Sequence, residues 1–286
     1  MRSWLLIPAG NAARLARAAS LAADVMVIDF HADGGETPAD VRAQAAAWIA
    51  TQRGHPNRFA RWVRIKPVTA PQWREDLAAV MSARPDGVIL ADAASPDEVR
   101  QLGSELYELE QQHGIAPNSV PMVLELGASA RGAMAIGGMV RDPNPRVCGM
   151  TWNPAMLARD IGAVGSAGKV GWAAPLAQVR AQTVLAAHTL GGLAVEAPFT
   201  AWRDSDAFAR ACAFARRDGF DAMMAVHPSQ LEAINQRFTP SEDARAEAAN
   251  IVAMFEASPS ANMLPLAGRM IGREHLAFAR RILSDF

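Results

Sequence analysis

Cysteine is scarce in this chain of 286 residues, which contains only two. Cys148 falls in a predicted strand and Cys212 in a predicted helix, and neither belongs to a Cys-x-x-Cys or Cys/His spacing. The pattern therefore indicates neither a disulfide framework nor a zinc site. We expect both cysteines to be reduced residues of the core.

Long basic runs and long apolar runs are also missing. The formal net charge is -1, and Lys and Arg are not clustered as binding to nucleic acid or to an anionic membrane surface would require. No apolar run reaches the length of a membrane span, and the apolar stretch of Met1–Pro8 is too short for a signal peptide and is ended by Pro8. We therefore expect a soluble, cytoplasmic protein that uses neither nucleic acid nor membrane as its main partner.

The composition is that of a large folded domain. Half of the residues are hydrophobic, 20% are charged, and the mean hydropathy is +0.03. Two modest domains would fit this length, but it is also typical of a single α/β barrel.

Short apolar runs alternate with helical stretches rich in Ala, Arg and Glu, which is the pattern of βα units and a parallel sheet. Eight strands are predicted, at Ser3–Pro8, Val25–Phe30, Trp62–Lys66, Gly87–Ala91, Met122–Leu126, Val147–Trp152, Leu193–Ala197 and Ala222–Val226. A doubly wound fold is the alternative, but no Gly-x-Gly-x-x-Gly follows the first strand. The sequence therefore predicts an α/β fold of the (β/α)8 TIM-barrel class, with extra C-terminal helices.

The helices predicted between these strands are Pro38–Arg53, Pro71–Ala83, Pro96–Gln112, Ser129–Val140, Gln178–Leu190 and Ser205–Arg217. Two further helices, Ser241–Ala257 and Glu274–Leu283, exceed what barrel closure needs. We expect a barrel over residues 1–240 and a helical extension over 241–286. The last helix has an apolar face of Leu276, Ala279, Ile282 and Leu283, which predicts docking on a neighbouring subunit. The glycine-rich stretch 162–171 is the most flexible-looking loop.

The predicted strand within Arg61–Pro67 carries charge in an unusual place. Period two puts Val63 and Ile65 on one face and Arg64, with Trp62 and Lys66, on the other. In a barrel, residues at the C-terminal end of a strand point into the mouth where substrates bind. An edge strand with solvated cations is the alternative.

Five motifs follow one another in an order that resembles one known family. They are Arg2–Pro8, Arg64–Pro67, Ala130–Gly132, Leu157–Gly162 and Ala225–Gln230, with Phe238–Ser241 and Leu266–Met270 in support. The chain resembles the citrate-lyase beta-subunit-like CoA-ester lyases of the HpcH/HpaI aldolase/citrate lyase superfamily. This resemblance implies a (β/α)8 barrel that cleaves or forms a C–C bond beside a carbonyl, often in a CoA thioester. It also implies a homo-oligomer, commonly a trimer with exchanged C-terminal helices.

The resemblance implies a set of site residues. The family's arginine falls on Arg64, whose planar guanidinium suits gripping a carboxylate and favouring an enolate. His31 stands at the end of a strand, where an imidazole can act as acid or base. Arg64 and His31 are the catalytic candidates, and Arg64, Arg2, Pro8 and Glu196 are the substrate-binding candidates, with a small carboxylate or acyl-CoA as ligand.

The positions that hold Mg²⁺ in the family differ here. Strand two should end in Glu-Asp but has His31 and Ala32; strand five should end in a metal-binding Glu but has Ala128; strand six should present Glu-Asp but has Ala155 and Met156. Alanine and methionine supply no hard oxygen ligand. We therefore expect no tightly held metal, and a net-positive mouth.

A displaced metal site remains the alternative. Its ligands would come from Asp33, Asp92, Glu125 or Glu196, of which Asp92 replaces a lysine of the family and Glu196 matches an acidic position. Glu125, three positions before Ala128, is expected on the other face of its strand.

Two polar residues have simpler structural readings. His227, before Pro228, is expected to fix a turn, and Ser129 is expected to cap a helix because no Gly-x-Ser-x-Gly elbow surrounds it. Tryptophans such as Trp152, Trp172 and Trp202 are expected in the core or the pocket wall.

Three functions stay open from the sequence. The first is a C–C lyase or aldolase acting on a small oxo or hydroxy acid or its CoA thioester, with an impaired or absent Mg²⁺ site. The second is a non-catalytic homologue, a pseudoenzyme that binds an acidic metabolite or a partner subunit. The third is a metal-independent hydrolase or isomerase that uses His31 with Asp33 or Glu196.

Overall fold

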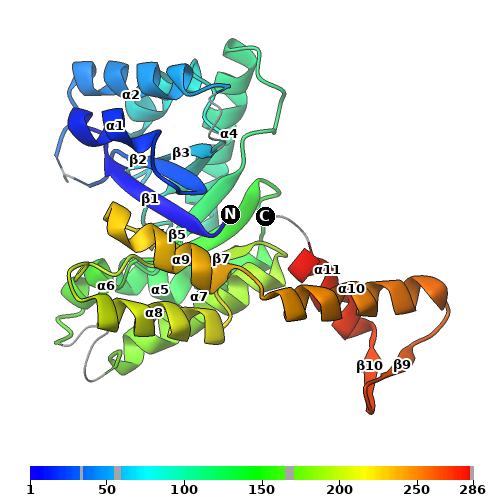
Figure 1. Ribbon diagram of the computed structural model, residues 1–286. Helices are drawn as coiled ribbons and strands as arrows, with labels where there is room; N and C mark the ends of the chain where they lie inside the picture. Colours follow the sequence, from blue (N-terminus) through cyan, green and yellow to red (C-terminus); the bar gives the residue numbers. More distant parts are fainter. Residues whose placement is uncertain (33–34, 55–58, 165–170, 284–286) are drawn as a thin grey trace.

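The computed structural model describes residues 1–32, 35–54, 59–164 and 171–283. Eight parallel strands close into a barrel in which β1 is hydrogen-bonded to both β2 and β8 (Figure 1). The strands are β1 Ser3–Pro8, β2 Val25–Asp29, β3 Ala60–Ile65, β4 Gly87–Leu90, β5 Met122–Leu126, β6 Val147–Trp152, β7 Leu193–Glu196 and β8 Ala222–Ala225. The predicted barrel is confirmed, and the bounds of every predicted strand agree with the observed bounds to within two residues.

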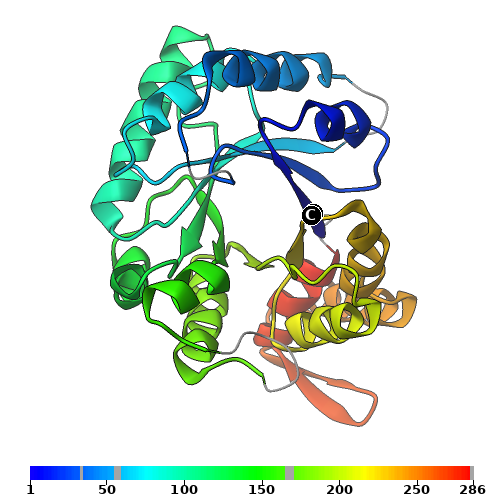
Figure 2. The ribbon, with the colours of Figure 1, turned by 90° about the vertical axis from the view of Figure 1, so that its left-hand side faces the viewer.

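Helices connect the strands and surround them (Figure 2). They are α1 Ala12–Ala18, α2 Ala39–Thr51, α3 Trp73–Met81, α4 Pro96–Gln112, α5 Ala130–Arg141, α6 Pro154–Asp160, α7 Ala174–Thr189, α8 Ser205–Arg217 and α9 Leu231–Phe238, with a 3₁₀ turn at Pro228–Gln230. Ser129 caps α5 as expected, because its hydroxyl accepts a hydrogen bond from the N–H of Gly132 at 3.1 Å. The glycine-rich stretch 162–171 lies largely outside the described residues.

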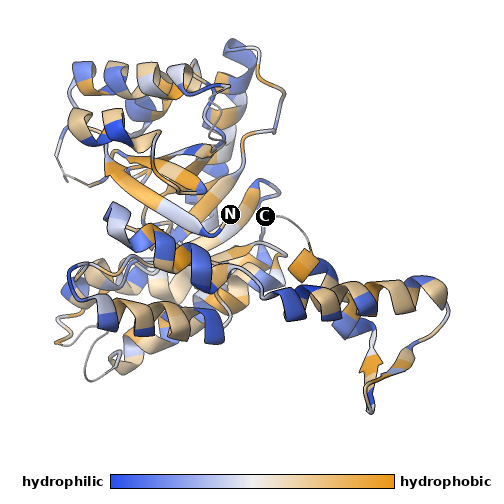
Figure 3. Ribbon diagram, in the orientation of Figure 1, coloured by the Kyte–Doolittle hydropathy of each residue, from blue (hydrophilic) through white to orange (hydrophobic). Residues whose placement is uncertain are grey.

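Strand alternation separates two apolar cores. Val63 and Ile65 belong to the large core between the strands and the helices, as their face of β3 predicts. Trp62 faces inward, where it packs edge-on against Trp4 with ring centroids 4.9 Å apart. Hydrophobic colour dominates the barrel strands, whereas the outer helices mix both kinds of residue (Figure 3). Inward-pointing residues at the C-terminal strand ends therefore form the mouth.

The C-terminal residues form an arm, defined here as residues 242–283. It consists of α10 Glu242–Ala257, β9 Met263–Leu266, β10 Arg269–Gly272 and α11 Arg273–Leu283, and it stands to one side of the barrel (Figure 1). Gly268 lies at the tip of the β-hairpin that β9 and β10 form. Ala267 and Gly268 have φ of 47° and 79°, the left-handed backbone that a two-residue hairpin loop favours. The extension is therefore not purely helical.

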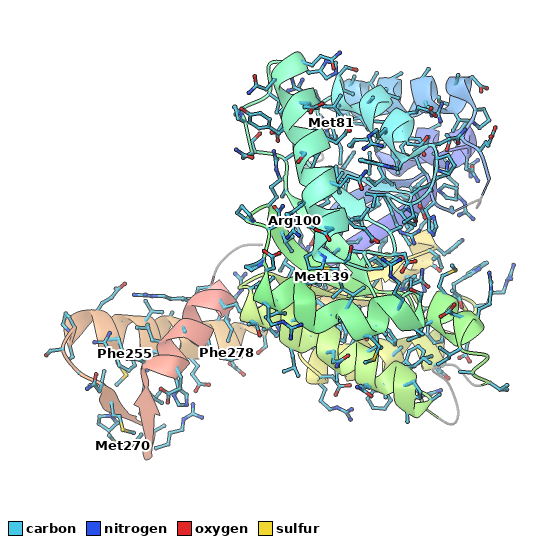
Figure 4. All side chains as sticks on the ribbon, turned by 180° about the vertical axis from the view of Figure 1, so that it is seen from behind. Met81, Arg100, Met139, Phe255, Met270 and Phe278 are labelled. Carbon is cyan, nitrogen blue, oxygen red and sulfur yellow. The ribbon has the colours of Figure 1, made fainter. Side chains whose placement is uncertain are left out.

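The arm has a small core of its own. Phe255 and Ile251 of α10 pack with Leu276 and Ala279 of α11, and all four are buried. The apolar face of α11 is therefore covered by α10 of the same chain. An uncovered apolar face was the reason to predict that this helix docks on a neighbouring subunit, and that reason is wrong. Other apolar side chains of the arm stay exposed, among them Phe278, with 62% of its surface exposed, and Met270 (Figure 4). No described helix has the length and apolar character that crossing a bilayer requires.

Candidate active site at the mouth of the barrel

Arg64 lies near the C-terminal end of β3 with its guanidinium held between two carboxylates. Its Nη1 donates to both oxygens of Asp29, at 3.1 and 3.0 Å, and its Nη2 donates to both oxygens of Glu125, at 2.9 and 2.7 Å. All three side chains are buried. We call these three residues the Arg64 cluster. Two paired contacts of this kind fix the plane of the guanidinium.

The strand register explains why these residues meet. Asp29 is the register partner of Arg64 on the neighbouring strand, and it ends β2 just as Arg64 approaches the end of β3. Glu125 points into the barrel from β5, so the expectation that it lies on the other strand face is wrong. The error came from counting strand periodicity backwards from Ala128, which lies beyond the last residue of β5.

The charge balance of the mouth is also different from the predicted one. One positive charge lies between two negative charges, so the Arg64 cluster is net negative and the expectation of a net-positive pocket is wrong. Burial alone would lower the pKa of Arg64, but Glu125 and Asp29 raise it above the ordinary value. The guanidinium therefore stays charged. Its buried Nε–H has no hydrogen-bond partner among the described residues.

His31 lies beside the cluster at the rim of the mouth. Its backbone N–H donates to Asp29 at 2.9 Å. Burial and the positive charge of Arg64 lower the pKa of the imidazole, against the opposite effect of Glu125 and Asp29. The lowered pKa favours the neutral imidazole, which has a ring nitrogen free of a proton.

Lys66, the second cation of the predicted strand face, has buried partners. Its Nζ donates to Thr37 Oγ1 at 2.6 Å and pairs with Asp76 Oδ2 at 3.1 Å. These bonds join the end of β3 to α3 and to the segment before α2. The ammonium of Lys66 therefore stabilises the packing of these segments.

The comparison with known protein families agrees with this geometry. A family model described as HpcH/HpaI aldolase/citrate lyase matches residues 2–228. The chain belongs to this family. It is 28% identical over 290 residues to a (3S)-malyl-CoA thioesterase of Cereibacter sphaeroides, covering 99% of this chain and 93% of that protein. It is 26% identical over 289 residues to a citrate lyase subunit beta-like protein of Deinococcus radiodurans, covering 99% and 96%.

Solved structures show the same architecture. CitE of Mycobacterium tuberculosis, in complex with magnesium, acetoacetate and coenzyme A, superposes with a TM-score of 0.68 at 25% identity, covering 99% of this chain and 96% of that chain. A citrate lyase of Burkholderia xenovorans superposes with a TM-score of 0.79 at 18% identity, covering 99% and 90%, which shows the shared fold.

The residues of this HpcH/HpaI family member do not fit the magnesium that the family implies. Ala128 is buried and Met156 half-buried, so the positions that should supply carboxylates offer a methyl group and a soft thioether. All four oxygens of Asp29 and Glu125 are bonded to Arg64. Within the described ranges, no three His, Cys, Asp or Glu side chains come together as a metal site would require. Asp33 lies outside those ranges, and the absence of a tightly held metal stays a prediction.

The other predicted site residues lie in different places. Pro8 is paired with Asp29 in the sheet, so it borders the Arg64 cluster. Arg2 lies at the opposite end of the barrel, where it bonds both oxygens of Asp24 at 2.9 Å and lines a cavity of about 910 Å³ beside α11. Glu196 faces α7, where it accepts hydrogen bonds from Arg180 at 2.7 Å and Trp152 at 2.6 Å. The structure therefore brings Arg64, His31 and Pro8 together, and leaves Arg2 and Glu196 apart from them.

His227 fixes a turn, as expected. Its Nδ1 accepts a hydrogen bond from the N–H of Ser229 at 3.2 Å, and Gln230 completes the capping box. Its ring also stacks on Trp202, with centroids 3.9 Å apart.

The sequence did not predict that three further residues bind Arg64 or one of its partners. Asp29 and Glu125 hold Arg64, and Asn153, the cap of α6, donates to Glu125 at 3.2 Å. The inward alternation of Val25, Val27 and Asp29 in β2 is the signal that could have identified Asp29.

Proposed function

We propose that this protein is a C–C lyase that acts on a small hydroxy or oxo acid or its CoA thioester, without a tightly held metal. The observation that carries the proposal is the buried Arg64 cluster at the C-terminal mouth of a barrel whose sequence belongs to an aldolase/citrate lyase family. Ligands of TIM-barrel enzymes bind at this end.

Each nearby residue has a role in this proposal. Arg64 supplies the positive charge of a cluster that is net negative as a whole, so it favours an enolate whose oxygen lies closer to the guanidinium than to Asp29 and Glu125. Both of its Nη atoms bind carboxylates and its Nε–H is buried, so a substrate contacts the guanidinium only when the side chains around it move. His31, whose backbone N–H is bonded to Asp29, accepts the proton of a substrate hydroxyl on its ring as the C–C bond breaks.

Hydrolysis of the thioester is the second candidate, because the (3S)-malyl-CoA thioesterase of Cereibacter sphaeroides aligns with 99% of this chain. The two reactions give different products from one substrate. Cleavage of the C–C bond of malyl-CoA yields glyoxylate and acetyl-CoA, whereas hydrolysis yields malate and free CoA.

The test is incubation of the protein with (3S)-malyl-CoA, with and without EDTA, followed by mass spectrometry of the products. Glyoxylate formed at the same rate in EDTA supports the proposal, and malate supports the second candidate. Arg64→Gln should lower the rate at least about a hundredfold, in line with removing a preorganised charge stabiliser. Binding of malyl-CoA without either product would indicate a non-catalytic homologue.

We also propose that the arm docks on another copy of the chain in a homotrimer, as the family resemblance implies. The exposed Phe278, Met263 and Met270 of the arm support this assembly.

A further inference from the structure

Asp92 is a carboxyl group of the mouth that lacks a cationic partner. Asp29 and Glu125 are both bonded to Arg64, but Asp92 forms no ion pair among the described residues. Its one hydrogen bond is long, with the Oγ of Ser129 donating to Oδ1 at 3.4 Å. Burying a carboxyl group partly without a counter-charge costs free energy, so a functional role would explain why Asp92 is present here.

The backbone holds Asp92 firmly in an uncommon conformation. It follows the C-terminal end of β4 and has a φ of 44°, in the left-handed region that aspartate tolerates better than most residues. The next two residues are fixed, because Ala93 N–H donates to Glu125 O at 2.9 Å and Ala94 N–H donates to Glu98 Oε2 at 2.8 Å. Strained backbone of this kind persists where the surroundings determine it and is frequent at functional sites.

The first turn of α5 leaves space for this carboxyl group. A Cβ atom on Gly132 would lie 3.3 Å from Asp92 Oδ1, so the absence of a side chain there makes room for the carboxylate. Ser129, the cap of the same helix, contacts the carboxylate from the other side. The pocket of Asp92 is thus built from β4 and the start of α5.

The charges around Asp92 favour its protonated form. Burial raises its pKa, and so do the negative charges of Glu125 on β5, Glu98 on α4 and Asp160 on α6, whereas the hydroxyl of Ser129 lowers it. Arg64 is bonded to Asp29 and Glu125, and Arg131 of α5 pairs with Glu98 at 3.4 Å, so neither of these cations pairs with Asp92. Asp92 therefore differs from the two carboxylates of the Arg64 cluster, each of which is bonded to a guanidinium.

We propose that Asp92 is a catalytic acid–base residue that exchanges a proton with the carbon next to the carbonyl of the bound substrate. The idea rests on the proposed function, because it needs an enolisable carbonyl compound in the mouth. In the forward step the carboxylate of Asp92 takes the proton, and the C–H electron pair forms the C=C bond of the enolate while the carbonyl electrons move to oxygen. In the reverse step the enolate carbon takes the proton back, and Asp92 is again a carboxylate.

The first test follows hydrogen exchange rather than bond cleavage. Acetyl-CoA is incubated with the protein in D₂O, and loss of the methyl proton signal is followed by NMR, with acetyl-CoA affinity measured by calorimetry. Wild-type protein should speed the exchange at least tenfold over buffer, and Asp92→Asn should return it to the buffer rate with the affinity within twofold of wild type. Asparagine is nearly isosteric with aspartate and tolerates the left-handed backbone, so the fold should be kept. Asp97→Asn is the matched control, because Asp97 has 85% of its side chain exposed on α4 and should behave as wild type.

The second test needs no ligand. A ¹³C NMR titration of aspartate carboxyl groups should show one group that titrates above the ordinary range of aspartate and is missing in Asp92→Asn. Absence of such a group overturns the proposal, as does equal exchange in wild type and Asp92→Asn, or no exchange with acetyl-CoA bound. If acetyl-CoA does not bind, the proposed function fails in that form, and the titration still decides the state of Asp92.

Discussion

Gly87, the first residue of β4, faces the inside of the barrel against Trp62. A Cβ atom at this position would lie 2.4 to 2.6 Å from three atoms of the indole ring, closer than atoms can approach. Trp62 is in turn packed edge-on against Trp4, so the ring has little freedom to withdraw. Packing around Trp62 inside the barrel therefore requires a residue without a side chain at position 87.

We expect Gly87→Ala to lower the free energy of unfolding by about 1–3 kcal/mol, the usual cost of overpacking a core. Urea denaturation measures this change. Gly54→Ala is the comparison, because no atom of the described residues beyond the chain neighbours of Gly54 lies within 4 Å of the added Cβ, although its positive φ brings strain of its own. A Gly87→Ala variant as stable as wild type would mean that the two tryptophans repack freely.

At the residue scale the sequence indicated Arg64 but not its partners. Period two in Arg61–Pro67 placed Arg64 on an inward face, and the structure has it there. Pairing with Asp29 and Glu125 depends on the closure of the barrel, which brings β5 opposite β3. Side chains that meet across a barrel cannot be read from the spacing within one strand.

A buried ion pair joins α4 to the start of β6. Arg146, next to the start of β6, donates to both oxygens of Glu110 of α4, at 2.6 and 2.7 Å, and both side chains are almost fully buried. Glu110 also accepts hydrogen bonds from the N–H groups of Asn118 and Val120. A buried carboxylate with this many donors fixes the loop between α4 and β5.

Removing one partner of this pair should be costly. Arg146→Leu leaves Glu110 buried without its cation, and we expect a loss of about 3–5 kcal/mol in the free energy of unfolding. The double variant Arg146→Leu with Glu110→Leu should recover part of that loss, because no unpaired charge remains. Chemical denaturation of the two variants decides the matter, and equal stability of Arg146→Leu and wild type would contradict this account.

The pair also predicts a dependence of stability on pH. Burial by itself raises the pKa of Glu110, but the hydrogen bonds from Arg146 and from the backbone of Val120 and Asn118 lower it below the ordinary value. A lowered native pKa stabilises the fold above the unfolded pKa, and this contribution is lost as pH falls through the native pKa. Wild type should therefore lose more stability on acidification than the double leucine variant does.

Long helices could be predicted from the sequence, and short helices could not. The 17 residues of α4 were predicted to the residue because a Ser-Pro start and a long helical pattern agree. α1 and α6, with 7 residues each, and α9, with 8, are too short for a clear period of 3.6 residues. The hairpin of the arm was not predicted, because its two strands have 4 residues each and are not continuous buried apolar runs like those of the barrel.

At the scale of the whole molecule, the family's metal chemistry can be tested by restoring its ligands. We expect Ala128→Glu combined with Met156→Asp to bind Mg²⁺ at least about tenfold more tightly than wild type, because the pair supplies two hard oxygen ligands. Isothermal calorimetry measures the affinity, and Ala128→Gln with Met156→Asn is the uncharged control. Equal affinity in all three proteins would show that these positions do not face a common point.

Assembly is tested on the arm. Phe278 has 62% of its surface exposed, and we expect Phe278→Ser to shift a trimer toward monomer in light scattering after size exclusion, with the fold of the barrel unchanged. Phe214→Ser on α8, where the ring is 50% exposed, is the control for losing an exposed aromatic residue. A wild-type protein that is monomeric at all concentrations would contradict the proposal.

The arm has a core separate from that of the barrel, so a rotation at the point where it joins the barrel would move it as one unit. Its 16-residue helix α10 spans about 24 Å at the helical rise of 1.5 Å per residue, and it begins just after Thr239 and Pro240. A rotation of about 10° at that point would carry the far end of the helix by about 4 Å over this length. Such a rotation would also have to open the ion pair between Arg281 of α11 and Asp221 of the barrel, so this pair couples the position of the arm to the base of β8.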